Sequence, residues 1–345
     1  MTNNSAQGFS QKLKSHTTKF LSDHFSTPVK RKKTAQKVGS LGVSLMKYII
    51  LFGLSFIILY PIIQQLAIAV RAPEDINNPT VLWIPERFSL ENFKIAMILL
   101  EYKDAFIQSV LISTGAMILQ VLSTALAGYT FARLYRFKAA GILFAIVIFT
   151  IIVPQTTIEL PLKLSLTNFL GTGKSLLGKP WLLFLFAGLG VGLKSGVFIY
   201  LFRQFFRRIP VELEEAAYVD GANPFQVFFK VMLPNARGVI ITVAILAFVW
   251  QWNDSYFTSV FVTDVNTTLQ TLTTKMLGVS QNMQSAITQA GIWQYFDQDV
   301  TKNPLFLSMI TNTAGILTML PLLVGYIFIQ NILFKEGIER TGIVG

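Results

Sequence analysis

Residues 207–234 read RRIPVELEEAAYVDGANPFQVFFKVMLP, a polar stretch that lies between two long apolar runs. Its first half predicts a short helix, because Pro210 suits a first helical position and three glutamates follow it closely. Negative charge is favourable near the positive end of the helix dipole. These glutamates are Glu212, Glu214 and Glu215. Gly221 then provides a permissive end to the helix.

The second half of this stretch predicts another short helix. Asn223 can cap it, with Pro224 at the first position and Gln226 three residues after the cap, which is a capping-box arrangement. Pro234 is expected to end this helix. The apolar face is small on the first helix (Leu213, Ala216, Ala217) and bulky on the second (Phe225, Phe228, Phe229, Met232). The stretch is therefore expected to be a structured loop and not a flexible linker.

The same residues follow a known spacing. Glu215-Ala216-Ala217, three further residues, Gly221, nine residues and Val231-Met232-Leu233-Pro234 resemble the pattern E-A-A-x3-G-x9-I-x-L-P. This pattern is the EAA loop of permease subunits in binding-protein-dependent ABC importers. The match departs only at Val231, where isoleucine is usual.

Three shorter segments point to one branch of that family. Residues 201–206 (LFRQFF), 252–254 (WND) and 127–133 (AGYTFAR) are similar to the carbohydrate branch, the maltose-transporter-type inner-membrane subunits. The resemblance covers residues 46–340, apart from part of 266–303. It implies a subunit of an ATP-driven importer that forms half of the translocation pathway for a sugar or oligosaccharide.

The resemblance also implies a fold and a set of partners. The fold is an all-α polytopic membrane protein with six transmembrane helices, type I ABC importer permease-like, with the EAA coupling loop (207–238) in the cytoplasm. The implied partners are two ATP-binding subunits, a second six-span permease subunit in a heterodimer, an extracytoplasmic solute-binding protein and membrane lipid. No cofactor is expected in this chain, which has no GK[ST] phosphate loop, and ATP is expected in the partner subunits. The residues implied to couple to the ATPase are Glu215, Ala216, Ala217, Gly221, Leu233 and Pro234.

Composition independently indicates a polytopic membrane protein. Hydrophobic residues make up 52% of the chain and charged residues only 14%, which is too apolar for an ordinary soluble domain. Six runs are long and apolar enough to span a bilayer: residues 48–70, 106–126, 139–161, 181–202, 239–262 and 305–334. Cysteine is absent, and both histidines, His16 and His24, precede the first run. A metal site or a histidine-based catalytic dyad within the spans is therefore not expected.

The distribution of charge predicts the orientation. The net charge is +11, and nine lysines or arginines precede Tyr48 against Asp23 alone. With an even number of spans, this places both termini on the cytoplasmic side of the cell membrane. The expected parts are a basic tail (1–45), a six-span permease domain (46–335) and a C-terminal tail (336–345). Apolar residues recur in 9–25 at helical spacing, so the tail is expected to be an interfacial amphipathic anchor or merely solvated charge.

Polar residues inside the predicted spans are candidates for the substrate pathway, because ionisable groups are costly in lipid. Lys194 interrupts the fourth span among glycines, and Asp254 follows Trp252 and Asn253 near the middle of the fifth. Aromatic rings beside amide and carboxylate groups are typical of sugar binding. Helix pairing is the alternative role for Lys194, and an inter-subunit polar clamp is the alternative for residues 252–254.

Other functional classes fit less well. An ABC permease for a non-sugar solute and a secondary transporter share the span pattern, and co-purification of an ATPase would exclude the secondary transporter. A membrane enzyme would need a cluster of catalytic groups, which the spans lack, so the chain is not expected to be an enzyme. A helix-turn-helix also joins two short helices at a glycine. The position of 207–234 between two spans argues against nucleic acid as a partner.

Labelling of single cysteines tests the orientation directly, because the natural chain has no cysteine. Cysteines at Ser15 and Thr341 are expected to be protected from an impermeant maleimide in intact cells, whereas a cysteine at Asn282 is expected to react. All three positions should react in permeabilised cells, which is the control. Reaction at Ser15 in intact cells would refute the predicted orientation.

Overall fold

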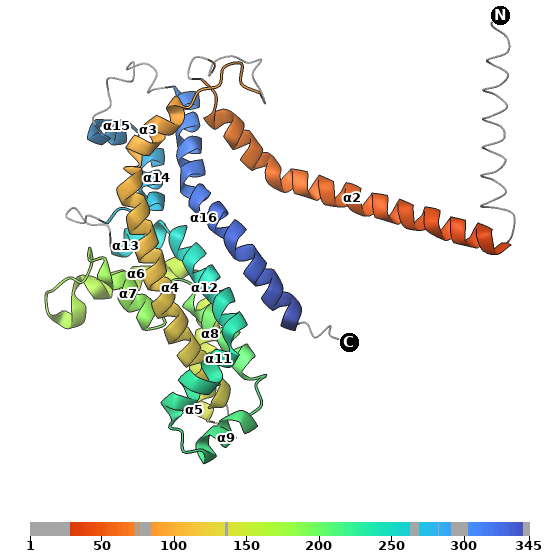
Figure 1. The fold of residues 1–345 in the computed structure, drawn as a ribbon. Coiled ribbons are helices and arrows are strands. Elements are labelled where there is room, and N and C mark those ends of the chain that lie inside the picture. The colour runs from red at the N-terminus through yellow and green to blue at the C-terminus, as the bar shows by residue number, and fades with distance from the viewer. Residues whose placement is uncertain are drawn as a thin grey trace, which may run out of the picture. The chain divides into compact units, whose positions relative to one another are not determined.

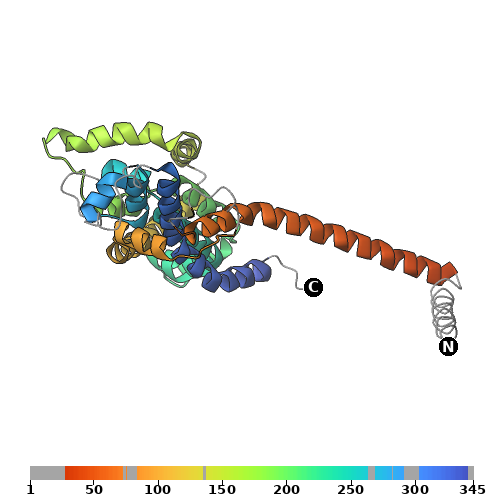
Figure 2. The same ribbon diagram turned by 90° about the horizontal axis from the view of Figure 1, so that it is seen from above.

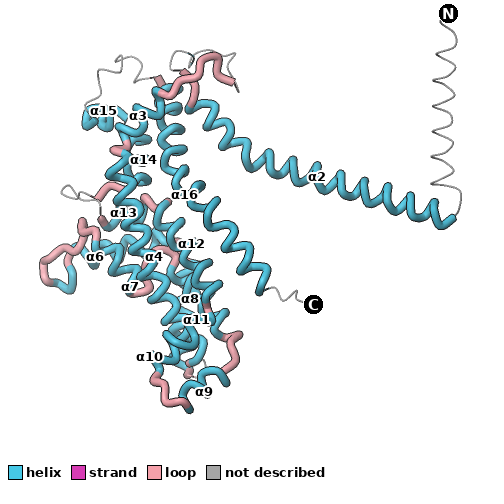
Figure 3. The backbone as a smooth tube through the Cα atoms, viewed as in Figure 1, coloured by secondary structure: helices cyan, strands magenta, loops and turns pink. Residues whose placement is uncertain are grey.

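The computed structural model describes residues 28–72, 75, 84–134, 137–262, 269–281, 283–290 and 303–340. Within these ranges the chain forms helices joined by loops, without a strand (Figure 1, Figure 3). The prediction of an all-α fold is confirmed for this part of the chain. The amphipathic helix expected in 9–25 and the labelling positions Ser15, Asn282 and Thr341 lie outside the described residues.

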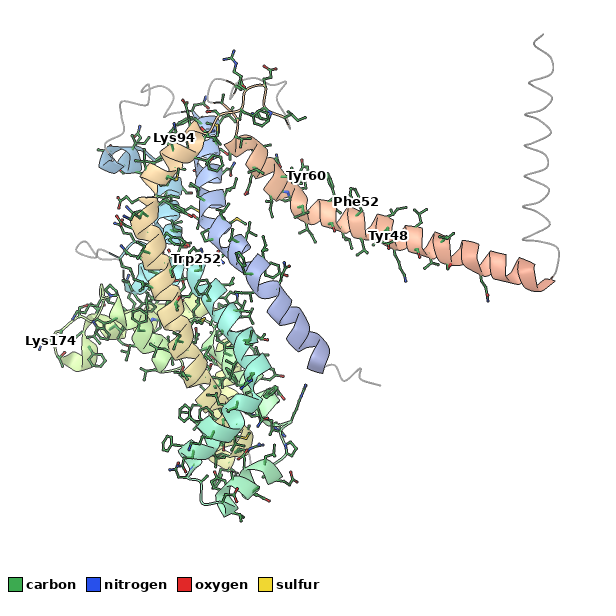
Figure 4. All side chains as sticks on the ribbon, viewed as in Figure 1. Tyr48, Phe52, Tyr60, Lys94, Lys174 and Trp252 are labelled. Atoms are coloured by element: carbon green, nitrogen blue, oxygen red, sulfur yellow. The ribbon has the colours of Figure 1, made fainter. Side chains whose placement is uncertain are left out.

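The chain divides into two compact units, residues 1–65 and residues 66–345. The described part of the first unit belongs to one helix, α2 (Pro28–Ala69), which begins well before the expected tail boundary at residue 45. Its segment Gly39–Ala69 is long and apolar enough to cross a membrane. Large side chains such as Tyr48 and Phe52 are exposed along it (Figure 4). Exposed apolar side chains along such a length are typical of a helix that lies in lipid or against other helices.

Helix α4 (Tyr102–Arg133) is the centre of the second unit. Helices α7 (Trp181–Gly188), α8 (Ser195–Phe206) and α12 (Arg237–Trp252) all pack against it (Figure 1). Helices α4, α8 and α12 share a core that includes Val121, Ala125, Phe198, Phe202, Val243 and Ala247. Helix α7 packs through a second cluster that includes Ile112, Leu182 and Phe186. Because one helix contacts the other three, any displacement of α4 must be accommodated by all of them.

Another group of helices packs at the end of this unit opposite α9 (Glu212–Val219) (Figure 1). It comprises α3 (Glu91–Leu99), α14 (Leu272–Gln281), α15 (Met283–Ala290) and the beginning of α16 (Pro304–Arg340). These helices share an apolar cluster that includes Ile95, Leu99, Val279, Ile287, Phe306 and Ile310. The segment 266–303, part of which falls outside the family resemblance, therefore contributes α14 and α15 to a core that they share with α3 and α16.

The six apolar runs form fewer straight helices than predicted. Within the described ranges, three helices are long and apolar enough to span a membrane: Gly39–Ala69, Tyr102–Arg133 and Pro304–Gln330. Two further candidates are bent pairs, residues 138–152 with 156–167 at 108°, and residues 224–235 with 237–252 at 82°. The described chain thus offers three to five candidate spans by length and composition, in place of six.

Proline and glycine explain where the predicted spans are interrupted. Helix α5 (Lys138–Ile152) ends before Pro154, because the residue preceding a proline disfavours the helical conformation. Helix α6 (Gln155–Thr167) follows after a bend of 108° and is seen lengthwise in Figure 2. The fourth run is divided into α7 and α8 by a glycine-containing segment. In the fifth run, α12 ends at Trp252 and α13 (Tyr256–Phe261) follows after a short break.

Helices α4 and α8 approach closely at Gly128. A Cβ atom on Gly128 would lie 2.5 Å from the Cβ of Phe202 and 2.9 Å from the backbone nitrogen of Arg203. Small residues allow membrane helices to come into backbone contact. This contact explains the glycine in the AGYTFAR segment, 127–133, without reference to a substrate.

The substitution Gly128→Ala is therefore expected to destabilise the protein. Overpacking of this kind costs about 1–3 kcal/mol, because the contacting helices must move apart. The matched control is Gly141→Ala in α5, where nothing lies within 4 Å of the added carbon. Thermal unfolding in detergent measures both variants, and equal midpoints for the two would contradict the close contact.

Candidate functional site

The segment 207–234 forms a loop of two helical parts at one end of the second unit. Helix α9 is the first part, and Gly221 follows with a φ of +84°, the left-handed conformation that favours glycine. The second part runs through α10 (Pro224–Gln226), the π-helix η3 (Val227–Met232) and α11 (Leu233–Asn235). The prediction of two short helices separated at Gly221 is confirmed.

The predicted capping box is present at the second helix. The backbone nitrogen of Gln226 donates to Oδ1 of Asn223, and the backbone nitrogen of Asn223 donates to Oε1 of Gln226, both at 2.9 Å. Pro224 occupies the first turn, where its missing N–H would have had no helical partner. Local sequence therefore determines where this helix begins.

Both proline boundaries of the loop were predicted wrongly. Helix α9 begins at Glu212, two residues after Pro210. The carbonyl of Ile209, which precedes Pro210, accepts a hydrogen bond from Arg133 at 3.2 Å. Pro234 does not end the second helix, which continues to Asn235. The wider π turn before Pro234 accommodates a residue without an N–H. The Asn235 side chain donates to the carbonyl of Val231 at 2.8 Å.

The two parts of the loop differ in how they are buried. The second part inserts Val227, Phe228 and Met232 into the core around α4 and α8. The Phe228 ring lies 5.3 Å from that of Tyr129 and 6.4 Å from that of Phe206. Most of α9 is exposed instead. The buried side chain in α9 is that of Glu214.

The residues expected to contact an ATPase lie mainly on the exposed part of this loop. Glu215, Ala216, Gly221 and Pro234 are exposed, and Ala217 and Leu233 are half-buried against the core. Neighbouring apolar side chains are also exposed, among them Val219 (88%) and Phe225 (71%). An exposed apolar surface of this kind is typical of a site for a protein partner.

Glu214 joins the loop to α4. One carboxylate oxygen of Glu214 accepts a hydrogen bond from the hydroxyl of Tyr129 at 2.9 Å, and the other accepts one from Nε of Arg133. Sequence reasoning used Glu214 only as a charge near the helix dipole. The signal that could have identified its partners is the AGYTFAR segment, which contains both Tyr129 and Arg133.

The break between α7 and α8 is a second candidate site. Lys194 precedes α8 with a φ of +61°, which is uncommon for a residue with a side chain. The side-chain nitrogen of Gln120 donates to the carbonyl of Leu193 at 2.6 Å and to the hydroxyl of Ser195 at 2.9 Å. The hydroxyl of Ser123 donates to the carbonyl of Ala187 at 2.6 Å. Sequence reasoning missed these two α4 residues, because a polar residue within a span does not identify its partner.

A cavity of about 600 Å³ adjoins this break, between α5, α6 and α8. Its walls are mostly aliphatic, and its polar lining residues include Thr150, Lys194 and Ser195. Lys194 is exposed, and its ammonium nitrogen lies 5.9 Å from the centre of the Trp250 ring. The break therefore presents a cation beside an apolar cavity and an aromatic ring.

Trp252 lies inside the helix bundle (Figure 4). It is 2% exposed, its indole nitrogen donates to the carbonyl of Thr318 at 3.1 Å, and its ring packs edge-on against Phe106. Asn253 is exposed at the end of α12 and donates to the carbonyl of Val249. In this structure Trp252 therefore holds α12 against α16.

Asp254 is buried at the beginning of α13, at a break instead of in the middle of a span. Its carboxylate accepts hydrogen bonds from the backbone nitrogen of Phe257 at 2.9 Å, the backbone nitrogen of Thr258 at 2.8 Å and the Thr258 hydroxyl at 2.7 Å. Both oxygens thus satisfy the N-terminal donors of a helix. Trp252 therefore connects α12 to α16, and Asp254 caps α13, through contacts within this chain.

Asp254→Ala is accordingly expected to lower the stability of the protein. Loss of these hydrogen bonds leaves buried donors without partners, at a cost of about 1–3 kcal/mol. Thr258→Val is the matched variant, since it removes only the hydroxyl bond and should cost less. Thermal unfolding of both variants checks this order, and an unchanged midpoint for Asp254→Ala would show that the cap is not stabilising.

Comparison with known proteins places the chain in a family. Residues 121–336 match the family described as "Binding-protein-dependent transport system inner membrane component". A "Probable ABC transporter permease protein" of Pyrococcus horikoshii is 29% identical over 59% of this chain and 71% of its own length. The "Alpha-glucoside transport system permease protein AglG" of Rhizobium meliloti is 31% identical, and the alignment covers 52% of this chain and 46% of AglG.

A solved structure shares the fold. It belongs to a bacterial ABC transporter involved in the import of the acidic polysaccharide alginate, with a TM-score of 0.64 and 18% identity. The alignment covers 85% of this chain and 97% of that one. The chain therefore belongs to the family of binding-protein-dependent transport system inner membrane components, the permease subunits of ABC importers.

Proposed function

We propose that this chain forms half of the translocation pathway of an ATP-driven importer for a sugar or oligosaccharide. Several relatives have carbohydrate names, including the alpha-glucoside permease AglG and the arabinooligosaccharide permease AraQ of Halalkalibacterium halodurans. The substrate is delivered by an extracytoplasmic binding protein. A second permease subunit completes the pathway, and two ATP-binding subunits drive it. The assembly lies in the cell membrane with both termini of this chain in the cytoplasm.

The observation that carries this proposal is the structured loop of residues 207–234. ATP hydrolysis in a separate subunit can move membrane helices only through a contact that resists deformation. Here the second part of the loop is held in the core by Val227, Phe228 and Met232, and α9 presents an exposed surface. Glu215 supplies a polar contact on that surface, and Ala216 and Ala217 allow a close approach.

We place the substrate pathway beside the break between α7 and α8. Lys194 contributes a charged donor next to the cavity, and Asn253 contributes an exposed amide. Trp252 and Asp254 belong to the same pathway as its supporting layer, because Trp252 binds the Thr318 carbonyl in α16 and Asp254 caps α13. Hydroxyl-rich solutes are recognised by such directional donors and acceptors beside apolar surfaces.

Two substitutions in the loop test the coupling role. Gly221→Asp forces a side chain into a left-handed conformation, which costs about 1–2 kcal/mol, whereas no atom within 4 Å opposes it sterically. Glu215→Lys reverses an exposed charge. Both variants are expected to remain inserted in the membrane but to release the ATPase subunits or to uncouple hydrolysis from transport.

Co-purification of the ATPase and substrate-stimulated hydrolysis in reconstituted membranes measure this outcome. Glu212→Lys is the matched control, because it makes the same charge reversal at another exposed position of α9. Normal co-purification and normal stimulation in both Gly221→Asp and Glu215→Lys would refute the coupling role. A ligand screen on the associated binding protein would separately test the assignment of sugar as the substrate.

A further inference from the structure

Helix α9 makes directional polar contacts with α4 through Glu214. The buried side chain of α9 is a carboxylate, Glu214, whose relative exposure is 5%. The second part of the loop is attached by apolar side chains, including Phe228 and Met232. Apolar contacts are non-directional and tolerate small sliding movements, whereas hydrogen bonds to a charged group require a particular geometry. The two parts therefore transmit displacement to the core in different ways.

Glu214 has two hydrogen-bond partners on α4. Its two oxygens are used by different partners, the Tyr129 hydroxyl and Nε of Arg133. Arg133 uses a further nitrogen to reach the carbonyl of Ile209, at the start of the loop. The side chains of Arg133 and Glu214 are only 16% and 7% exposed. Hydrogen bonds between such charged groups are stronger than neutral ones, and removal of one partner leaves the other charge buried.

Helix α4, which binds Glu214 near its C-terminal end, also binds the backbone at the break between α7 and α8. Tyr129 and Arg133 lie in the last turns of α4, and Gln120 and Ser123 lie nearer its middle. The rise from Gln120 to Arg133 is about 20 Å at the helical rise per residue. Gln120 and Ser123 bind the carbonyls of Leu193 and Ala187 on the two sides of the break. One continuous helix thus connects α9 to the backbone beside the cavity.

We propose that Glu214 is a positioning residue that transmits movement of the coupling loop to α4, and through α4 to the α7–α8 break. This inference rests on the proposed coupling function of the loop. It assigns neighbouring glutamates to different partners: exposed Glu215 contacts the ATPase, and buried Glu214 contacts this chain's own α4. Tyr129 and Arg133 share the positioning role, because they are the groups that Glu214 binds.

A labelling experiment on the full transporter, purified with its partner subunits, tests the inference. Val191→Cys introduces a single thiol into this chain at an exposed position of the break. The rate of its reaction with maleimide is measured with and without MgATP and vanadate, so that no transported substrate is needed. The nucleotide is expected to change this rate about fivefold or more, the scale of a typical allosteric coupling.

The contacts between Glu214 and α4 are then weakened in two ways. Glu214→Gln removes the charge, and Tyr129→Phe removes one hydroxyl while keeping the ring that packs on Phe206 and Phe228. Both variants are expected to retain the ATPase subunits and basal ATP hydrolysis but to lose most of the nucleotide-dependent change at Val191→Cys. Glu212→Gln is the matched control, because Glu212 is an exposed glutamate in the same turn of α9, and it should behave as the parent.

The possible outcomes separate the two proposals. A full nucleotide response in both Glu214→Gln and Tyr129→Phe would overturn the transmission role, as would the absence of any response in the parent transporter. Loss of the ATPase subunits from Glu214→Gln would instead make Glu214 a direct partner contact and also overturn it. Failure of the coupling proposal itself is detected independently, by normal behaviour of Glu215→Lys and Gly221→Asp.

Discussion

Backbone groups freed by interruptions of a helix need partners inside the protein, because lipid offers none. In the second unit, α4 supplies many of these partners. Gln120 and Ser123 bind carbonyls at the α7–α8 break, and Arg133 binds the carbonyl that precedes α9. The interrupted spans therefore require an adjacent unbroken helix, whose polar side chains lie level with the freed backbone groups.

The same helix is also approached closely by its neighbours. Gly128 brings α8 into backbone contact, and the aromatic rings around Tyr129 fill the space below it. Close packing and directional polar contacts together make α4 resistant to independent movement. This property suits a helix that lies between a loop for an energy-supplying partner and a cavity beside the proposed pathway.

The polar residues of the predicted spans show that residue type alone does not identify the partner of a side chain. Trp252 and Asp254 have the chemistry of a sugar site, yet their polar atoms bind the Thr318 carbonyl and the first turn of α13. Helix ends buried in a membrane protein need the same donors and acceptors that a solute does. Residue type alone therefore does not separate the two uses, whereas burial and partner geometry do.

Local sequence determined the features of this protein that depend on neighbouring residues. These are the helical class, the capping box at Asn223, the turn at Gly221 and the family spacing from Glu215 to Pro234. Each arises from backbone conformation or short-range hydrogen bonding, which a few consecutive residues control.

Only the tertiary structure decided which helices bend and which polar groups meet. The partners of Glu214 lie more than 80 positions earlier in the chain, and those of Gln120 more than 70 positions later. Arg133, which binds the Ile209 carbonyl at the start of the loop, likewise lies 76 positions earlier in the chain. Apolar periodicity identifies a face that is buried, but it does not specify the side chain that covers it. Contacts between distant segments therefore determined the sites, even where local sequence determined the helices that carry them.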